Sequence, residues 1–198
     1  MPDPALTPQA LASYANRSPF AVPGAAPPPP HVTPKPRQQI LSAADWTLIH
    51  KANIDYSENV DPHAPNYRWR WHDRPHFDLG HRLQTDCSGW ATMLHWLAGA
   101  PDPSGSNWAP GNTATMLAHC GTPLAHSQVV PGDLCVYGAG GGAHVSLVVG
   151  LMGTTDFWEI GHGYQGAPSR GTHSATAAWF AGRGNPQVRF LRVPGLAL

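Results

Sequence analysis

The sequence predicts an α+β fold in which N-terminal helices pack on a small antiparallel β-sheet. Apolar residues at helical spacing are found between residues 41 and 121. Short runs rich in β-branched residues, bounded by glycine, follow after residue 130. Helices that precede a group of strands are typical of the α+β class. The 198-residue chain is long enough for one domain with a substantial core and an additional tail.

The first segment, residues 1–38, is predicted to be a proline-rich arm or linker. Eleven of the 22 prolines lie within the first 36 residues. Such a sequence favours extended polyproline conformation and buries little apolar surface. A short helix is expected at about residues 8–14. The folded domain is therefore expected to span residues 39–198.

The first helix of the domain is predicted to start at Ser42 and to run to about Ala52. Ser42 is an N-cap residue type, and Asp45 three positions later completes a capping box. Leu41 and Trp46 have the spacing of a hydrophobic staple across this helix start. A later helix is expected at residues 113–119, where Gly121 would end it.

The segment Thr85-Asp86-Cys87-Ser88-Gly89 precedes another predicted helix. Gly99 and Pro101 are placed to end that helix. Its apolar residues fall at i, i+3, i+4 and i+7, namely Trp90, Met93, Leu94 and Leu97. Cys87 therefore lies at or near a helix N-terminus, where unpaired N–H groups and the helix dipole favour a thiolate. We expect the thiol pKa to fall below its usual value of about 8.5, as suits a nucleophile.

Four apolar runs are predicted as strands, at residues 131–137, 144–149, 157–160 and 187–193. The glycine run 138–142 separates the first two, which resemble a hairpin. His144 opens the second strand and is expected to point toward Cys87, while His162 follows the third strand and could hold the His144 ring. Nucleophile, base and orienting group fit a Cys/His/polar triad. Glu159 or His173 remains an alternative to His162 as the orienting group. The region after residue 160 is otherwise expected to be rich in loops.

Together these motifs resemble the NlpC family of papain-like cell-wall cysteine peptidases, over about residues 40–195. The resemblance is strongest to the versions found in bacteriophage lysins and virion-associated peptidoglycan hydrolases. The segments that carry it are residues 85–89, 98–103, 131–137, 144–149 and 161–163. The resemblance implies a papain-like fold with the nucleophile at a helix N-terminus.

The resemblance also implies a role for each site residue. Cys87 would be the nucleophile, His144 the base and His162 the third member of the triad. The backbone N–H of Cys87, with Tyr56 or Ser88, would stabilise the oxyanion, and Asp86 would cap the helix. No cofactor would be needed. The substrate would be bacterial peptidoglycan, cut at an amide bond of the stem peptide such as γ-D-glutamyl–diamino acid, although the sequence does not fix the bond.

Three other functions remain compatible with the sequence. A cysteine amidase or acyltransferase could use the same fold, and a wall-binding module could have lost activity. A structural virion component could be docked into a phage tail by the proline-rich arm. We expect synthesis in the bacterial cytoplasm without a signal peptide, and action at the cell wall after holin-type release or as part of a virion.

Composition excludes several other classes. The formal net charge is zero and 12% of residues are charged, which does not favour nucleic-acid binding or a polybasic membrane patch. No apolar run approaches the roughly 18 residues that span a bilayer. The three cysteines make no disulfide framework, and we expect Cys120 and Cys135 to be buried structural residues.

Residues 59–84 are unusually rich in histidine and aromatic residues. Tyr67, Trp69 and Trp71 alternate with arginines, a pattern that suits either packing or stacking on glycan rings. The segment also contains three histidines at spacings of four and five residues, His72, His76 and His81. Pro75 and Gly80 argue against a single helix presenting them, and no common zinc motif occurs. No metal site is therefore predicted.

Overall fold

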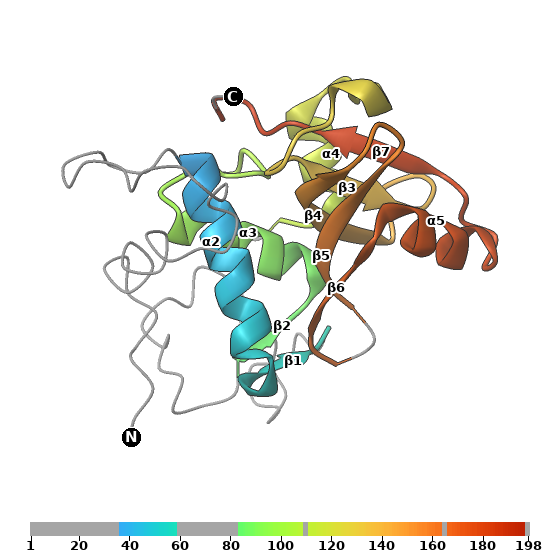
Figure 1. Ribbon diagram of the computed structural model, residues 1–198. Coiled ribbons are helices and arrows are strands. Elements are labelled where there is room, and N and C mark those ends of the chain that lie inside the picture. Colours follow the sequence, from blue (N-terminus) through green and yellow to red (C-terminus); the bar gives the residue numbers. More distant parts are fainter. Residues whose placement is uncertain (1–35, 59–82, 109–110, 164–165, 197–198) are drawn as a thin grey trace.

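The computed structural model describes residues 36–58, 83–108, 111–163 and 166–196 and has a mixed α+β architecture (Figure 1). The α+β class predicted from the sequence is confirmed. The helices are α2 (Pro36–Ile49), α3 (Cys87–Leu97), α4 (Thr113–Cys120) and α5 (His173–Ala181). Single 3₁₀ turns occur at η1 (Lys51–Asn53) and η3 (His126–Gln128). None of the helices in these ranges is long and apolar enough to cross a membrane.

Five strands form one antiparallel sheet in the order β6-β5-β4-β3-β7. The strands are β3 (Leu134–Tyr137), β4 (His144–Met152), β5 (Asp156–His162), β6 (Pro168–Thr172) and β7 (Val188–Leu191). A separate parallel pair is made by β1 (Ile54–Tyr56) and β2 (Leu83–Thr85). The pair leads the chain directly into α3, which begins two residues after β2 ends.

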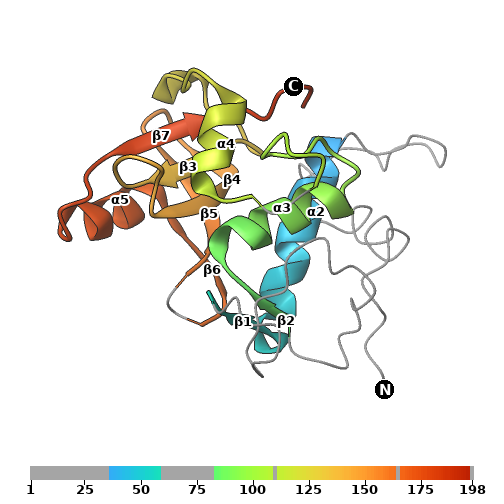
Figure 2. The same cartoon turned by 180° about the vertical axis from the view of Figure 1, so that it is seen from behind.

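The two faces of the five-stranded sheet carry different helices. Figures 1 and 2, viewed from opposite directions, show α2 and α3 on one side and α5 on the other. Val145, Leu147 and Val149 of β4 share an apolar core with α2 and α3, and we call this side the α3 face. The alternate residue Val148 packs in a second core with Phe157, on what we call the α5 face.

The predicted start of the first helix is wrong, because α2 begins at Pro36 rather than at Ser42. Proline suits a first helical turn, where its missing N–H needs no partner. Ser42 lies inside the helix, where its Oγ donates to the Gln38 carbonyl at 3.0 Å. Arg37, which the sequence analysis assigned to the arm, donates to Asp133 Oδ1 at 3.1 Å. It therefore belongs to the folded domain.

The predicted starts of the other two early helices are confirmed. Asp86 is the N-cap of α3, and its Oδ1 accepts from the Gly89 N–H at 2.6 Å. Asn112 caps α4 and forms a reciprocal capping box with Thr115. Gly121 ends α4 with a φ of 72°, which favours glycine.

Two elements were not predicted, since the region after residue 160 was expected to be loop. Edge strand β6 has the sequence Pro-Ser-Arg-Gly-Thr, which has no alternation of apolar and polar residues. Helix α5 has no fully buried residue and no apolar stripe along one side. The pairing of β6 with β5 forms the strand through a tertiary contact, whereas α5 begins with a local cap, in which Thr172 Oγ1 accepts from the Ala175 N–H at 3.3 Å.

The four predicted strands are confirmed as β3, β4, β5 and β7, with shifted ends. Several other expectations lie outside the described residues. These are the short helix at residues 8–14, the aromatic residues Tyr67, Trp69 and Trp71, and the histidines His72, His76 and His81.

Candidate active site

Cys87 is the first residue of α3 and lies immediately after the cap Asp86. Its side chain is 7% exposed. The backbone amide of Val145, one residue after His144, lies close enough to the sulfur to favour the thiolate. The chain therefore brings Cys87 from α3 against the first residues of β4, whereas the His144 ring, expected to point toward Cys87, stacks on Phe180 of α5.

The expected lowering of the Cys87 pKa is wrong. Burial, together with the neighbouring Asp86 charge, raises the pKa of this thiol to about 11. The backbone amides of Val145 and Ser88 act in the opposite direction but do not outweigh burial. At neutral pH the Cys87 side chain is therefore a thiol, not a thiolate.

His144 opens β4, and its ring lies on the α5 face. It stacks on Phe180 of α5 at a centroid distance of 5.7 Å and an interplanar angle of 22°. The ring also lies over β5, where a Cβ placed on Gly161 would come within 2.8 Å of His144 Nε2. Glycine at this position leaves room for the imidazole. Burial lowers the His144 pKa to about 4, so the ring is neutral and able to accept a proton at pH 7.

His162 ends β5 on the α3 face and is fully buried. Tyr56 of β1 contacts its ring edge-on, at a centroid distance of 5.3 Å. Burial lowers the His162 pKa to about 4, an effect that the Asp86 charge partly offsets. Within the described part of the chain, neither ring nitrogen makes a well-directed hydrogen bond.

The three triad candidates lie at the same end of the sheet but are not hydrogen-bonded to one another. Among the described residues no hydrogen bond links Cys87 to either histidine, and none links His144 to His162. The two histidines occupy opposite faces of the β4–β5 pair. The His144 ring lies over Gly161, and the next residue of the strand, His162, points to the other face. His144 nevertheless lies near enough for its charge to lower the His162 pKa.

The remaining predicted site residues surround the start of α3. Ser88 Oγ donates to Asp86 Oδ1 at 2.9 Å, so this hydroxyl supports the helix cap. Tyr56 Oη donates to Glu58 Oε1 at 2.5 Å. Burial is the main cause that raises the Tyr56 pKa, and the Glu58 hydrogen bond and the Cys87 charge raise it as well. The phenol therefore remains protonated and can donate at neutral pH.

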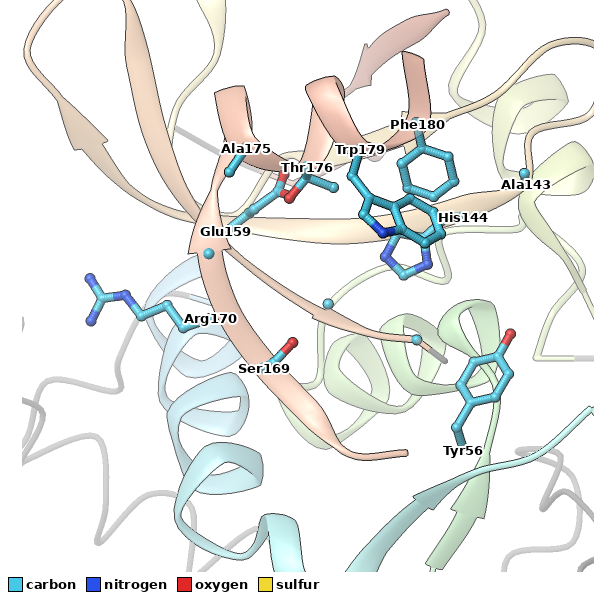
Figure 3. A pocket seen from close by; sticks show the side chains of 13 residues that line it. Tyr56, Ala143, His144, Glu159, Ser169, Arg170, Ala175, Thr176, Trp179 and Phe180 are labelled. Carbon is cyan, nitrogen blue, oxygen red and sulfur yellow. The ribbon is translucent and has the colours of Figure 1, made fainter. Parts of the chain in front are cut away.

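A cavity of about 490 Å³ adjoins this cluster, between α5 and strands β5 and β6 (Figure 3). His144, Tyr56 and Glu159 contribute to its wall, together with Trp179 and Phe180 of α5. Figure 3 shows the His144 ring beside these two aromatic side chains, with Tyr56 at some distance across the cavity. Cys87 and His162 do not line it. The cavity thus reaches one of the two candidate histidines.

The alternative orienting groups, Glu159 and His173, lie on the α5 face with His144. Glu159 Oε2 accepts from Tyr137 Oη at 2.6 Å and from Ser146 Oγ at 2.9 Å, and burial raises the pKa of its carboxyl group. Neither residue is hydrogen-bonded to His144 among the described residues. The sequence analysis missed Phe180 as the neighbour of His144, because it did not predict α5.

Comparison with known proteins gives no family assignment. No protein-family model matches the chain, and a search of curated proteins finds no match. The functional proposal therefore rests on the chemistry of the site and on the motifs that build it.

Proposed function

We propose that the chain is a papain-like cysteine peptidase of the NlpC type that hydrolyses an amide bond in the stem peptide of bacterial peptidoglycan. The observation that carries this proposal is the contact of Cys87, in the first turn of α3, with the Val145 amide beside His144. A thiol at a helix start and a neutral imidazole on an adjoining strand are the parts that nucleophilic acyl transfer needs.

His144 is the better candidate for the base. The general base of a peptidase must also return its proton to the leaving amine, and so it must reach the substrate. His144 lines the cavity, whereas His162 is fully buried and does not. His162 then acts as a positioning residue behind the pair, together with Tyr56.

Because the resting pair is neutral, proton transfer accompanies attack. The Cys87 thiol gives its proton to His144 as sulfur adds to the amide carbonyl. Collapse of the tetrahedral intermediate breaks the C–N bond, and His144 returns the proton to the departing amine. Water then hydrolyses the thioester and releases a free carboxyl group. The Asp86 cap accepts the Gly89 N–H, so the backbone N–H of Cys87 at the start of α3 is the group suited to bind the oxyanion.

Mass spectrometry of purified muropeptides incubated with the protein tests this proposal. We expect products that together contain one added water, with a new amine and a new carboxyl group at the same stem-peptide bond. Cys87→Ala should form no product, while Cys120→Ala is the matched control and should act like the wild type. Absence of cleavage by the wild type on stem peptides of differing composition would exclude the peptidase function, as would full activity in Cys87→Ala.

A further inference from the structure

A second group of reactive side chains lies beneath α5 and has no part in the proposed peptidase chemistry. Cys135 comes from β3, Glu159 from β5 and His173 from the first residue of α5. One donor atom from each residue lies within 4.8 Å of the other two. Cys135 is fully buried and Glu159 is 3% exposed, so the group is inside the protein rather than on its surface.

The spacing of these atoms is close to that of ligands around a tetrahedral metal ion. Cys135 Sγ lies 3.7 Å from His173 Nδ1. With Zn–S near 2.3 Å and Zn–N near 2.0–2.1 Å, two tetrahedral ligands are separated by about 3.6 Å. Thiolate, imidazole and carboxylate are also the ligand types that zinc uses in proteins.

Tyr137 hydrogen-bonds to two members of this group. Its Oη lies 2.6 Å from Glu159 Oε2 and 2.8 Å from His173 Nδ1. The ligands also have supporting partners, as metal ligands usually do. Ser146 Oγ donates to the Glu159 carboxylate at 2.9 Å, and the His173 ring stacks on Phe157 at a centroid distance of 4.5 Å.

We propose that Cys135 Sγ, His173 Nδ1 and the Glu159 carboxylate bind one divalent ion of the zinc type. The ion would link β3, β5 and the start of α5. Since Phe180 of the same helix covers His144, occupancy of the site would also hold α5 against the candidate base. The competing explanation is a purely hydrogen-bonded network, in which the four groups satisfy one another without an ion.

Cobalt substitution separates these explanations, because a Co²⁺–thiolate bond gives an intense charge-transfer absorption that histidine and carboxylate ligands do not give. The probe is Co²⁺ added to the full-length, untagged protein after chelator treatment. The chain has two other cysteines, so the decisive variant is Cys87→Ala/Cys120→Ala, in which Cys135 is the sole thiol. We expect this variant to show the thiolate band, saturating at about one Co²⁺ per chain and abolished by added Zn²⁺.

Two further variants assign the remaining ligands. His173→Ala and Glu159→Gln, in the same two-alanine background, should weaken Co²⁺ binding at least about tenfold. Cys135→Ala in the otherwise native chain should lose the band, with circular dichroism confirming that the variant is folded. Zn²⁺ should raise the melting temperature of the wild type more than that of Cys135→Ala.

The proposal is independent of peptidase activity, since every readout is spectroscopic or thermal. Absence of a thiolate band in the variant whose sole thiol is Cys135 would overturn it and would leave the hydrogen-bonded network as the explanation. A wild-type band that is retained in Cys135→Ala and lost in Cys87→Ala would place the ion at the nucleophile, and would overturn it equally.

Discussion

The two faces of the five-stranded sheet differ in what they bury. The α3 face carries a continuous apolar core from α2, α3 and β4, in which Leu147 and Trp90 are fully buried. The α5 face has a smaller core in which polar and aromatic side chains are mixed, such as Tyr137, Glu159 and His173. The candidate site draws its nucleophile from the first region and its base from the second.

This difference suggests a division of roles. The apolar α3 face holds the start of α3 in place and, by burying Cys87, keeps its thiol protonated. The α5 face forms the cavity and covers His144 with Phe180. The first face therefore provides a buried apolar environment, and the second provides a cavity beside His144.

The largest expected effect is a loss of stability in acid. The size of this loss tests how many histidines each face of the sheet buries. Burial lowers the pKa of His95, His144 and His162 from 6.5 to about 4. The unfolded chain therefore binds more protons between these pH values, and the free energy of unfolding should fall as the pH drops from 6.5 to 4. Each histidine contributes about 1.4 kcal/mol per pH unit.

Urea unfolding measured across this pH range checks the prediction. His95 and His162 lie on the α3 face and His144 on the α5 face, where burial also lowers the pKa of His173, so both faces should contribute to the histidine effect. His162→Gln should show a shallower pH dependence than the wild type, by about 1.4 kcal/mol per pH unit. An unchanged slope in this variant would mean that His162 titrates normally in the folded protein.

Truncation of an apolar side chain on the α3 face should have the next largest effect. Leu147 is fully buried in the core shared with α3. Leu147→Ala should lower the free energy of unfolding by about 2–5 kcal/mol, through lost burial and the cavity left behind. Urea unfolding at pH 7 measures this value, and a loss below about 1 kcal/mol would show that the core can collapse around the gap.

Removal of one hydroxyl group tests the polar network of the α5 face. Tyr137→Phe keeps the ring that stacks on Phe180 but leaves Glu159 and His173 without a shared partner. We expect a loss of about 1–3 kcal/mol in unfolding free energy, the cost of leaving buried polar groups unsatisfied. A neutral Tyr137→Phe would contradict the importance of the network.

The smallest effect concerns the relative reactivity of the three thiols. Burial raises the pKa of Cys87 and Cys120 to about 11, and it raises that of Cys135 well above its ordinary value. Only Cys120 is partly exposed. Iodoacetamide at pH 8 should therefore label Cys120 first, then Cys87, and Cys135 last, as followed by peptide mass spectrometry. If Cys87 were labelled much faster than Cys120, its thiolate would be stabilised after all.

The sequence-based prediction succeeded where local signals and burial agree. Local sequence signals specify both α3 and β4, and both elements are present in the structure. For α3 the signals are the cap Asp86 and the apolar spacing, and for β4 the signal is the β-branched run. Strand β6 was not predicted because it depends on pairing with β5, and α5 was not predicted because it has no apolar stripe along one side. The start of α2 was misplaced because Ser42, a typical cap residue, lies within the helix, while Arg37 is held by Asp133.

For the candidate site, too, the sequence predicted what local signals determine and missed what depends on tertiary packing. The positions of Cys87 and His144 near one end of the sheet followed from chain order and residue type. The sign of the Cys87 pKa shift did not, because desolvation depends on all the atoms around the sulfur rather than on the helix end alone. The placement of His144 and His162 on opposite faces also depends on the β4–β5 register, which sequence motifs do not give.

The central claim is that Cys87 from one face works with His144 from the other, and the kinetics of the two histidine variants test it most directly. His144→Gln should lower kcat/KM on a soluble muropeptide by at least about 10³-fold, because proton transfer is lost. His162→Gln should lower it much less, since that residue only positions the pair. The reverse order, with His162→Gln inactive and His144→Gln near wild type, would contradict the claim and assign the base to the α3 face.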